Sequence, residues 1–249
     1  MKKICRKFLT QGGVNDKLIM KVVGNMNEES LSYVDNEKMP VGFSKILFCI
    51  FKRFIDLLFS VLALFPFFLI TIIVKILYML SGDFHPIFYT HKRVGKFGKN
   101  FRLIKYRTMV VNSDEVLQKM LKQKKYQKEW KEFHKFDDDP RITKVGKILR
   151  KCSIDELPQI INIIKGDMSI IGPRPLIEEE VLEYKDNREK LLSIKPGLTG
   201  WWACNGRSCT NNEERMELEL YYVDHFSFSL DIKCFFLTII KVIKREGAK

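Results

Sequence analysis

The feature that most restricts the fold of this chain is a long apolar segment with a proline at its centre. Residues 57–74 contain no charged side chain, and about 18 apolar residues is the lower limit for a helix that crosses a bilayer. Pro66 lies in the middle of the segment, where the missing N–H and the ring of proline kink a helix. We therefore expect a kinked, membrane-embedded helix within residues 45–80.

Two membrane topologies fit this segment. A kinked spanning helix would place the preceding residues on the opposite side of the membrane from the rest of the chain. A re-entrant helix would turn at Pro66 and leave by the face through which it entered. Lys52 and Arg53 precede the segment and Lys75 follows it, and because Lys and Arg concentrate on the cytoplasmic side, we favour the re-entrant topology. A buried helix of a soluble protein is the remaining alternative.

The rest of the chain forms two further regions. Residues 1–44 are polar, and glycine and asparagine interrupt any helical period, so we expect a loosely structured arm. Residues 81–249 contain a predicted strand at residues 101–107 and several helical patterns. They end in an amphipathic helix over residues 226–243, which we expect at the membrane interface or packed on the core. The predicted fold class is α+β, mainly helical.

Charge and cysteine content limit the partners and the compartment. The formal net charge is +13, which favours an anionic partner and leaves nucleic acid, anionic lipid and phosphorylated substrates open. The six cysteines include no C-x-x-C pair, and the four histidines have no metal-ligand spacing relative to them. This argues against a zinc site and indicates reduced thiols in a cytosolic setting.

The strongest chemical candidate is the adjacent carboxylate pair Asp155 and Glu156, which follows a basic stretch at residues 141–152. We expect a helix to begin near Ser153 or Asp155 and to end at Gly166 in the left-handed conformation. One interpretation is structural, since Ser153 and Glu156 match a capping box and Asp155 suits an N-cap. The other is catalytic: Asp155 attacks phosphorus, Glu156 acts as acid or base, and a metal and cations offset the phosphate charge.

Several motifs occur in an order that is similar to one known family. They occupy residues 105–109, 139–143, 155–159, 166–169, 172–175, 196–201 and 205–207. Through them the chain resembles the bacterial sugar transferases, the monotopic polyprenyl-phosphate phosphoglycosyl transferases, over about residues 52–245. The lysine-rich segment at residues 112–136 resembles the longer hexose-1-phosphate transferases of that family.

The resemblance implies an activity and a location. The implied reaction transfers sugar 1-phosphate from a UDP-sugar, with a hexose favoured, to undecaprenyl phosphate. It releases UMP through a covalent aspartyl-phosphosugar intermediate, requires Mg²⁺, and is the first membrane step of surface polysaccharide or glycoconjugate synthesis. The implied fold is monotopic, with a Pro-kinked re-entrant helix and interfacial amphipathic helices. The catalytic domain, residues 81–249, would lie on the cytoplasmic face of the bacterial inner membrane, against membrane lipid. A homodimer is left open.

The resemblance also assigns roles to individual residues. It implies Asp155 and Glu156 as catalytic residues, with Asp155 also a metal ligand. The implied substrate-binding residues share a position in or beside the motifs, and they are Lys105, Arg107, Arg150, Pro173, Arg174, Asn205 and Arg207.

Two departures from the family pattern limit these expectations. Phe65 replaces the usual serine before Pro66, so no hydroxyl is available for the carbonyl that the kink frees. Ala203 replaces the usual glutamine after the tryptophans, which leaves the sugar contacts of that loop open. The sequence does not specify the sugar, the pathway, the oligomeric state or the role of residues 1–44.

Two other function classes are compatible with the residues themselves. A membrane-tethered nucleic-acid binder would explain the net charge of +13, but the chain contains no recognisable binding module, and we expect no nucleic-acid partner. A metal-dependent hydrolase of nucleotide sugars would need the same carboxylates and cations as a transferase. Release of sugar phosphate without a lipid acceptor would distinguish the hydrolase.

Overall fold

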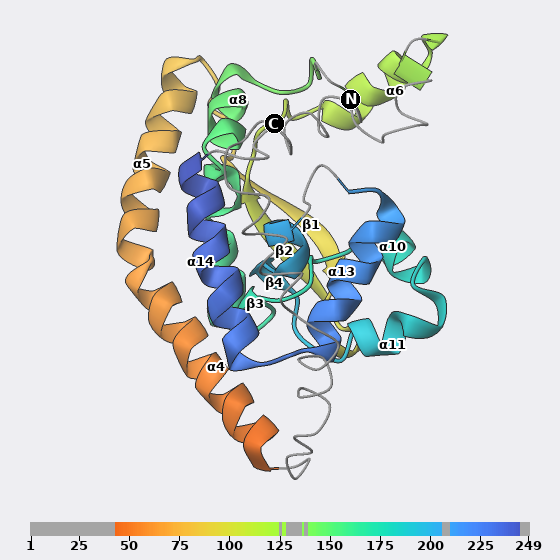
Figure 1. The fold of residues 1–249 in the computed structure, drawn as a ribbon. Coiled ribbons are helices and arrows are strands. Elements are labelled where there is room, and N and C mark those ends of the chain that lie inside the picture. The colour runs from red at the N-terminus through yellow and green to blue at the C-terminus, as the bar shows by residue number, and fades with distance from the viewer. Residues whose placement is uncertain (1–42, 125, 128–135, 137–138, 206–209, 245–249) are drawn as a thin grey trace.

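The computed structural model describes residues 43–124, 126–127, 136, 139–205 and 210–244. The predicted polar arm lies almost wholly outside them, as does Arg207. Three long helices run along one side of the molecule, a two-stranded hairpin lies in the middle, and shorter helices cover the other side (Figure 1). This arrangement is mainly helical with two small sheets, as the predicted α+β class requires.

The long helices are α4 (Phe43–Leu62), α5 (Leu64–Leu80) and α14 (Phe228–Lys244). The strands are β1 (Phe88–Val94), β2 (Asn100–Tyr106), β3 (Ser169–Ile171) and β4 (Gly197–Thr199). The shorter α-helices are α6 (Ser113–Leu121), α8 (Lys144–Lys151), α9 (Gln159–Lys165), α10 (Glu178–Leu182), α11 (Arg188–Leu191), α12 (Trp201–Asn205) and α13 (Asn212–Asp224). Single 3-10 turns are η1 (Lys96–Gly98), η2 (Ile154–Glu156) and η3 (Lys185–Asn187).

The predicted apolar segment forms two helices with a break at Ala63. The axes of α4 and α5 differ by 44°. Ala63 donates its N–H to the Phe59 carbonyl and Phe67 donates to the Ala63 carbonyl, but Pro66 has no N–H for the carbonyl of Leu62. Among the described helices, none by itself has the length and apolar character of a membrane span, whereas this bent pair has them jointly. The membrane topology stays a prediction.

An apolar surface runs along α4, α5 and α14. Phe54 and Val61 on α4, and Phe68 on α5, expose more than half of their surface, at 60%, 55% and 63%. On α14, Phe236 is 58% exposed. This helix lies beside α4, as the ring contact between Phe59 and Phe235 shows, with 6.0 Å between their centroids. An apolar surface of this extent marks a site of membrane or protein contact.

Two cations of α4 bind the domain that follows it in the sequence. Lys52 Nζ donates to Asp231 Oδ2 at 2.6 Å and to the Ile171 carbonyl at 2.9 Å. Arg53 donates to the Ile163 carbonyl at 2.6 Å, at the end of α9. The flanking charges that favoured a cytoplasmic location are therefore also structural ties between α4 and β3, α9 and α14.

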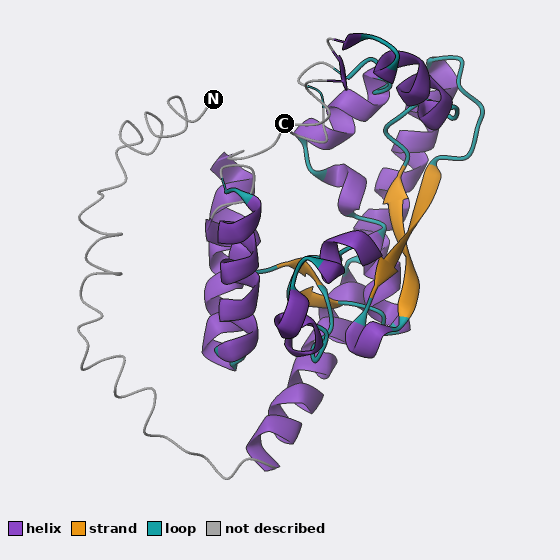
Figure 2. Cartoon of the chain, turned by 90° about the vertical axis from the view of Figure 1, so that its right-hand side faces the viewer, coloured by secondary structure: helices purple, strands orange, loops and turns teal. Residues whose placement is uncertain are grey.

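The far end of α5 packs against the same domain. Val74 and Tyr78 are buried in a core with Tyr106, Val145 and Leu149. The Tyr78 hydroxyl donates to the carbonyl of Arg107, which follows β2. Both α4 and α5 thus contact one domain, and the break at Ala63 lies between these contacts in the sequence. Helices (purple) make up most of the described chain, and the strands (orange) are few and short (Figure 2).

Two close backbone approaches connect the small parallel sheet to the turn after it. β3 pairs with β4 in parallel, and Gly197 donates its N–H to the Pro173 carbonyl at 2.7 Å. A Cβ on Gly197 would lie 2.1 Å from the Gly172 nitrogen, so this crossing admits only glycine. The crossing fixes the direction in which the chain enters the turn at residues 172–175.

Some local predictions were wrong. α9 begins at Gln159 rather than near Ser153, although it ends at Gly166 with φ of +90°, as predicted. Of the lysine-rich helix predicted over residues 112–136, α6 covers Ser113–Leu121 and a turn at residues 122–123 interrupts it before the helical residues 124 and 126–127. Residues 125 and 128–135 lie outside the described part of the chain, so the prediction is untested there. The strand predicted at residues 101–107 and the amphipathic C-terminal helix are confirmed as β2 and α14.

Candidate active site around the carboxylate pair

The carboxylate pair lies in η2, a single turn between α8 and α9. Ser153, which precedes this turn, has φ of +54°, a conformation that is uncommon outside glycine. Ile154 and Leu157 point into the core shared with α5, where they pack against its buried residues. Asp155 and Glu156, between these two anchors, remain partly exposed. The alternation of apolar and acidic residues therefore turns the carboxylates away from the core.

The capping interpretation of this motif is wrong. The Ser153 side chain makes no capping hydrogen bond, and the chain at Ser153 is left-handed rather than extended. α9 begins only after Pro158, which also supplies no side-chain cap. Because neither residue makes a side-chain cap, helix capping does not explain the two adjacent acids, and the catalytic interpretation becomes the stronger one.

Two predicted substrate-binding cations flank the pair. Lys105, near the end of β2, donates from Nζ to Glu156 Oε1 at 2.7 Å. Arg150, in the last turn of α8, donates from Nε to Thr108 Oγ1 at 3.0 Å. Burial raises the pKa of Asp155, the Glu156 carboxylate raises it further, and Lys105 and Arg150 oppose both effects. Asp155 therefore lies within the electrostatic reach of both cations.

Helix α8, which carries Arg150 in its last turn, has a capped N-terminus. Thr143 is the N-cap, and its Oγ1 accepts the N–H of Gly146 at 2.9 Å. Gly146 lies against the backbone of Thr108, because a Cβ on Gly146 would be 2.0 Å from the Thr108 carbonyl oxygen. This contact holds α8 against the segment that follows β2, so that Arg150 and Lys105 converge on η2.

Arg174, the arginine of the predicted Pro-Arg-Pro turn, belongs to a second group of residues. Its backbone N–H donates to both oxygens of Glu219 at 3.1 Å. Its exposed guanidinium lies 5.5 Å from the ring centroid of Trp202, a cation–π distance. Trp202 in turn donates from Nε1 to Thr210 Oγ1 at 2.7 Å. Glu219 and Trp202 were not among the predicted site residues.

Arg93 connects the two groups electrostatically and was also missed. Burial and Arg174 lower the pKa of Arg93, whereas Glu180 and Glu156 are among the groups that raise it. Its guanidinium is 3.4 Å from Glu180 Oε2. The basic stretch of residues 91–99 contained this arginine, but nothing in that stretch distinguished Arg93 from the surrounding cations.

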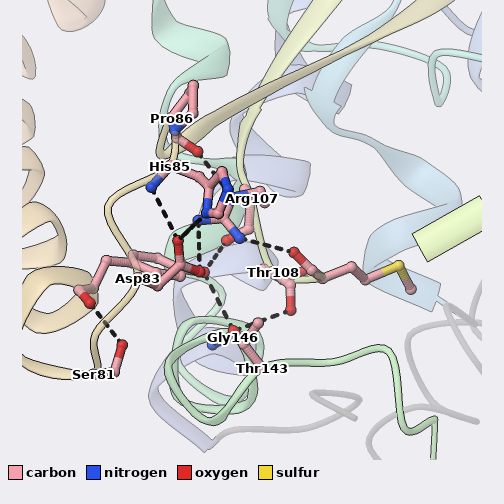
Figure 3. A network of polar contacts seen from close by, with 10 residues as sticks. Ser81, Asp83, His85, Pro86, Arg107, Thr108, Thr143 and Gly146 are labelled. Atoms are coloured by element: carbon pink, nitrogen blue, oxygen red, sulfur yellow. Dashed lines mark hydrogen bonds and ion pairs between the residues drawn. The ribbon is translucent and has the colours of Figure 1, made fainter. Parts of the chain in front are cut away.

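Arg107 has structural partners instead of a free guanidinium, so we withdraw its assignment to substrate (Figure 3). It is 8% exposed, and it donates to the Pro86 carbonyl at 2.8 Å, to the Met109 carbonyl at 3.2 Å and to Asp83 Oδ1 at 2.9 Å. Its carbonyl accepts the Tyr78 hydroxyl. Arg107 therefore joins the loop after α5 to the end of β2.

The remaining predicted positions differ in what the structure says of them. Pro173 is buried and accepts a backbone hydrogen bond from Gly197. Asn205 is exposed at the end of α12 and donates to the Trp201 carbonyl at 2.8 Å. Arg207 lies outside the described residues.

The described residues contain no group of three or more potential metal ligands. This is compatible with Mg²⁺, which is commonly bound by one or two carboxylates plus substrate phosphates. Asp155 and Glu156 supply two adjacent carboxylates, and among the described residues no side chain donates a hydrogen bond to Asp155 that would compete for its oxygens. The pair thus fits a magnesium site that substrate completes.

These observations define a class of site. Two adjacent carboxylates lie among Lys105, Arg150 and Arg93, in a domain that packs on an apolar helix pair. Such a combination suits a phosphorylated ligand that is handled at an apolar boundary.

Comparison with known proteins identifies the family. A sequence model described as "Bacterial sugar transferase" matches residues 47–245, so the chain belongs to the bacterial sugar transferase family. This confirms the predicted resemblance and the predicted class, a transferase, at the level of the family.

Several relatives have informative names. The chain is 42% identical over 181 residues to the UDP-galactose-lipid carrier transferase of Erwinia amylovora, covering 72% of this chain and 38% of the relative. It is 42% identical over 172 residues to the undecaprenyl-phosphate galactose phosphotransferase of Salmonella typhimurium, covering 69% and 36%. It is 42% identical over 198 residues to the exopolysaccharide production protein ExoY of Sinorhizobium fredii, covering 79% and 87%. The chain thus spans less than two fifths of the first two relatives and most of the third.

Proposed function

We propose that this protein transfers sugar 1-phosphate from a UDP-sugar to undecaprenyl phosphate at the cytoplasmic face of the bacterial inner membrane. The reaction releases UMP and begins the assembly of a surface polysaccharide or glycoconjugate. A hexose is the favoured sugar, and two relatives whose names specify galactose support that choice.

One observation carries the proposal: Asp155 lies in a turn whose neighbours are Lys105 and Arg150, in a chain of this family. A carboxylate is a poor nucleophile toward a diphosphate because both groups are negatively charged. Cations placed beside it lower the repulsion and stabilise the charge that develops in the transition state. The raised pKa of Asp155 also indicates a carboxylate that is less well solvated than one at the surface.

In the first step, a carboxylate oxygen of Asp155 attacks the sugar-bearing phosphorus of the UDP-sugar. The bond between this phosphorus and the bridging oxygen breaks, and that oxygen leaves with its electron pair as part of UMP. Asp155 then carries the sugar 1-phosphate as an acyl phosphate. Lys105, Arg150 and Arg174 are the residues that we expect to bind the phosphates, Arg174 with bidentate geometry.

In the second step, a phosphate oxygen of undecaprenyl phosphate attacks the same phosphorus and releases the Asp155 carboxylate. Glu156 accepts the proton of the incoming lipid phosphate where that phosphate is protonated, and Lys105 holds Glu156 in place at 2.7 Å. Asp155, with Glu156 beside it, would hold Mg²⁺, which when bound offsets the negative charge of the diphosphate.

The apolar helix pair supports a membrane location with both ends on one side. Lys52 and Arg53 on α4 contact the domain through β3 and α9, and Tyr78 on α5 contacts it near β2. A straight spanning helix would carry one of these ends to the opposite side of the membrane. A re-entrant pair, with Ala63 at its deepest point, keeps both contacts and faces the exposed apolar residues toward lipid.

The proposal is tested by replacing the nucleophile without changing its shape. Asp155→Asn should abolish transfer from UDP-galactose to undecaprenyl phosphate in the presence of Mg²⁺, while the thermal unfolding midpoint stays close to that of wild type. Mass spectrometry of wild-type protein incubated with UDP-galactose and no acceptor should detect a hexose-phosphate adduct on Asp155. Asp186→Asn, at an exposed aspartate of η3, is the matched control and should remain active.

The assay also separates the transferase from a hydrolase. Steady release of sugar phosphate or free sugar without a lipid acceptor would favour hydrolysis. An Asp155→Asn variant with full turnover would refute the nucleophile assignment.

A further inference from the structure

Glu219 is an acidic side chain that the proposed reaction does not use. It lies on α13, is 2% exposed, and accepts the Arg174 backbone N–H with both carboxylate oxygens at 3.1 Å. A buried carboxylate is costly unless it is paired and hydrogen-bonded. The position of Glu219 behind a predicted substrate-binding arginine therefore calls for an explanation.

The backbone of the turn that Glu219 contacts, residues 173–175, is restricted on both sides of Arg174. Pro173 and Pro175 restrict the backbone on both sides of Arg174, and Gly197 holds the Pro173 carbonyl. The Arg174 N–H is thus the one backbone donor between the two prolines. Its hydrogen bond to Glu219 sets the orientation of the residue, and the guanidinium then lies over Trp202.

A buried ionic cluster surrounds Glu219. Arg215, one turn earlier on α13, donates to Glu180 Oε1 at 3.0 Å, and Glu180 on α10 also pairs with Arg93 at 3.4 Å. The Tyr184 hydroxyl is buried and has no hydrogen-bond partner in the described part of the chain. Arg174, Arg215, Glu180 and Tyr184 are the charged and titratable groups whose electrostatic coupling to Glu219 is resolved.

We propose that Glu219 is a positioning residue for Arg174, and that its ionised form holds the arginine in the orientation that binds the donor diphosphate. This inference rests on the proposed function for the identity of the donor. An ionised carboxylate accepts a stronger hydrogen bond than a neutral one, and it attracts the Arg174 guanidinium as well. Protonation of Glu219 weakens both interactions and loosens the turn.

The expected pH dependence follows from the environment of Glu219. Burial raises its pKa to about 7, although the Arg174 N–H and the Arg174 and Arg215 guanidinium groups oppose this effect. Donor affinity should therefore rise as pH increases through about 7, because Glu219 becomes ionised over that range. Stability has the opposite sign: the contribution from neutral Glu219 is complete below the pKa of an unfolded glutamate and is lost as pH rises through the folded value.

The first measurement observes the turn without any substrate. The chain has three tryptophans, so Trp130→Phe with Trp201→Phe leaves Trp202 as the single indole, beneath the Arg174 guanidinium. Its emission should titrate with a midpoint near pH 7. Glu219→Gln should remove this titration, Glu219→Asp should retain it with a shifted midpoint, and Glu217→Gln, at an exposed glutamate of the same helix, should leave it unchanged.

The second measurement is donor affinity by calorimetry in an Asp155→Asn background, which prevents turnover. UDP-galactose is the probe, because both its phosphates are esterified and neither titrates near neutral pH. At pH 8, Glu219→Gln should weaken binding by about tenfold, the difference between a charge-assisted and a neutral hydrogen bond. At pH 6, where wild-type Glu219 is already protonated, the same substitution should have little effect.

The outcomes separate this inference from the proposed function. A Trp202 titration that persists in Glu219→Gln, or a loss of affinity of equal size at pH 6 and pH 8, would overturn the positioning role. Full turnover in Asp155→Asn would instead refute the nucleophile, and it would leave the titration of Trp202 as an independent test of Glu219. If Glu219→Gln does not fold, the pH titrations of wild type and of Glu219→Asp still decide the question.

Discussion

At the scale of single residues, the cations of the site differ in whether the side chain or the backbone contacts the rest of the protein. Lys105 and Arg150 interact with the carboxylate turn through their side chains. Arg174 is held through its backbone, and its guanidinium donates no hydrogen bond to the residues that the structure describes. Arg107 has the same charge but uses its donors within the fold. Charge alone therefore does not identify a binding residue; the partners of each nitrogen do.

This distinction leads to a prediction for Arg174. Arg174→Lys keeps the charge and the backbone N–H that Glu219 accepts, but it removes the planar, bidentate donor geometry. Affinity for UDP-galactose, measured by calorimetry in the Asp155→Asn background, should fall by about tenfold or more, consistent with the loss of one charge-assisted hydrogen bond. Lys151→Arg, at an exposed cation of α8, is the control. Unchanged affinity in Arg174→Lys would place Arg174 outside the donor site.

At the scale of elements, the geometry of the site depends on how closely α8 approaches the end of β2. Thr143 caps α8, and Gly146 brings the helix into contact with Thr108. The same contact brings Arg150 within 3.0 Å of the Thr108 hydroxyl. A change in this approach would displace one of the two cations that act on Asp155.

Gly146→Ala tests this close contact, because a real contact and an ordinary helical position predict opposite changes in the free energy of unfolding. At an ordinary helical position, replacing glycine with alanine stabilises a protein by about 1 kcal/mol. Here the added Cβ would lie 2.0 Å from a backbone oxygen, so we expect the free energy of unfolding to fall by about 2 kcal/mol. Chemical denaturation measures the difference, and Lys144→Ala, at an exposed position of α8, is the control. An increase in stability would show that α8 and Thr108 are farther apart than described.

At the scale of the whole molecule, the apolar helices and the site share one core. Val74 and Tyr78 of α5 pack with Tyr106, Val145 and Leu149, and η2 anchors its apolar residues in the same cluster. The carboxylates therefore lie close to the helix pair that we expect in the membrane. This proximity suits a reaction between a water-soluble donor and a lipid phosphate.

The re-entrant topology predicts where the N-terminal arm lies. In a variant whose other five cysteines are replaced with serine, Cys5 should resist a membrane-impermeant maleimide in intact cells and react after permeabilisation. The reason is that α4 and α5 both bind the same domain, which we expect on the cytoplasmic face. A cysteine introduced in place of Ser229, exposed at the start of α14, is the matched cytoplasmic control. Labelling of Cys5 in intact cells would establish a spanning helix.

Local patterns in the sequence were enough for several conclusions. The charge-free run predicted a helical segment, which is present as α4 and α5 because helix length and backbone hydrogen bonding are local properties. The bend lies at Ala63, and a kink caused by Pro66 stays a prediction. The periodicity of residues 226–243 led to α14, and Gly166 ended α9 because a left-handed residue there needs no distant partner. The adjacent acids and the order of the motifs also led to the correct family.

Only the tertiary structure decided which polar residues act together. Ser153 and Glu156 matched a capping box, but the packing of Ile154 and Leu157 into the α5 core holds the chain in a turn instead of a helix. Likewise, the sequence treated Lys105 and Arg107 alike, although one faces the carboxylates and the other is buried. Residues two apart in a strand lie on the same face, but β2 ends at Tyr106, so Arg107 lies beyond the strand. Its guanidinium is buried against Asp83 and the Pro86 carbonyl, which come from the loop after α5.

The same reason explains why Glu219 and Arg93 were missed. Glu219 lies in a helix with several other acids, and Arg93 lies among basic residues, so composition around each suggests a solvated surface. Each acquires its role from a partner far along the chain: Arg174 for Glu219 and Glu180 for Arg93. Long-range pairing places these charges in the interior, where the low dielectric makes a charge interaction strong enough to organise a site.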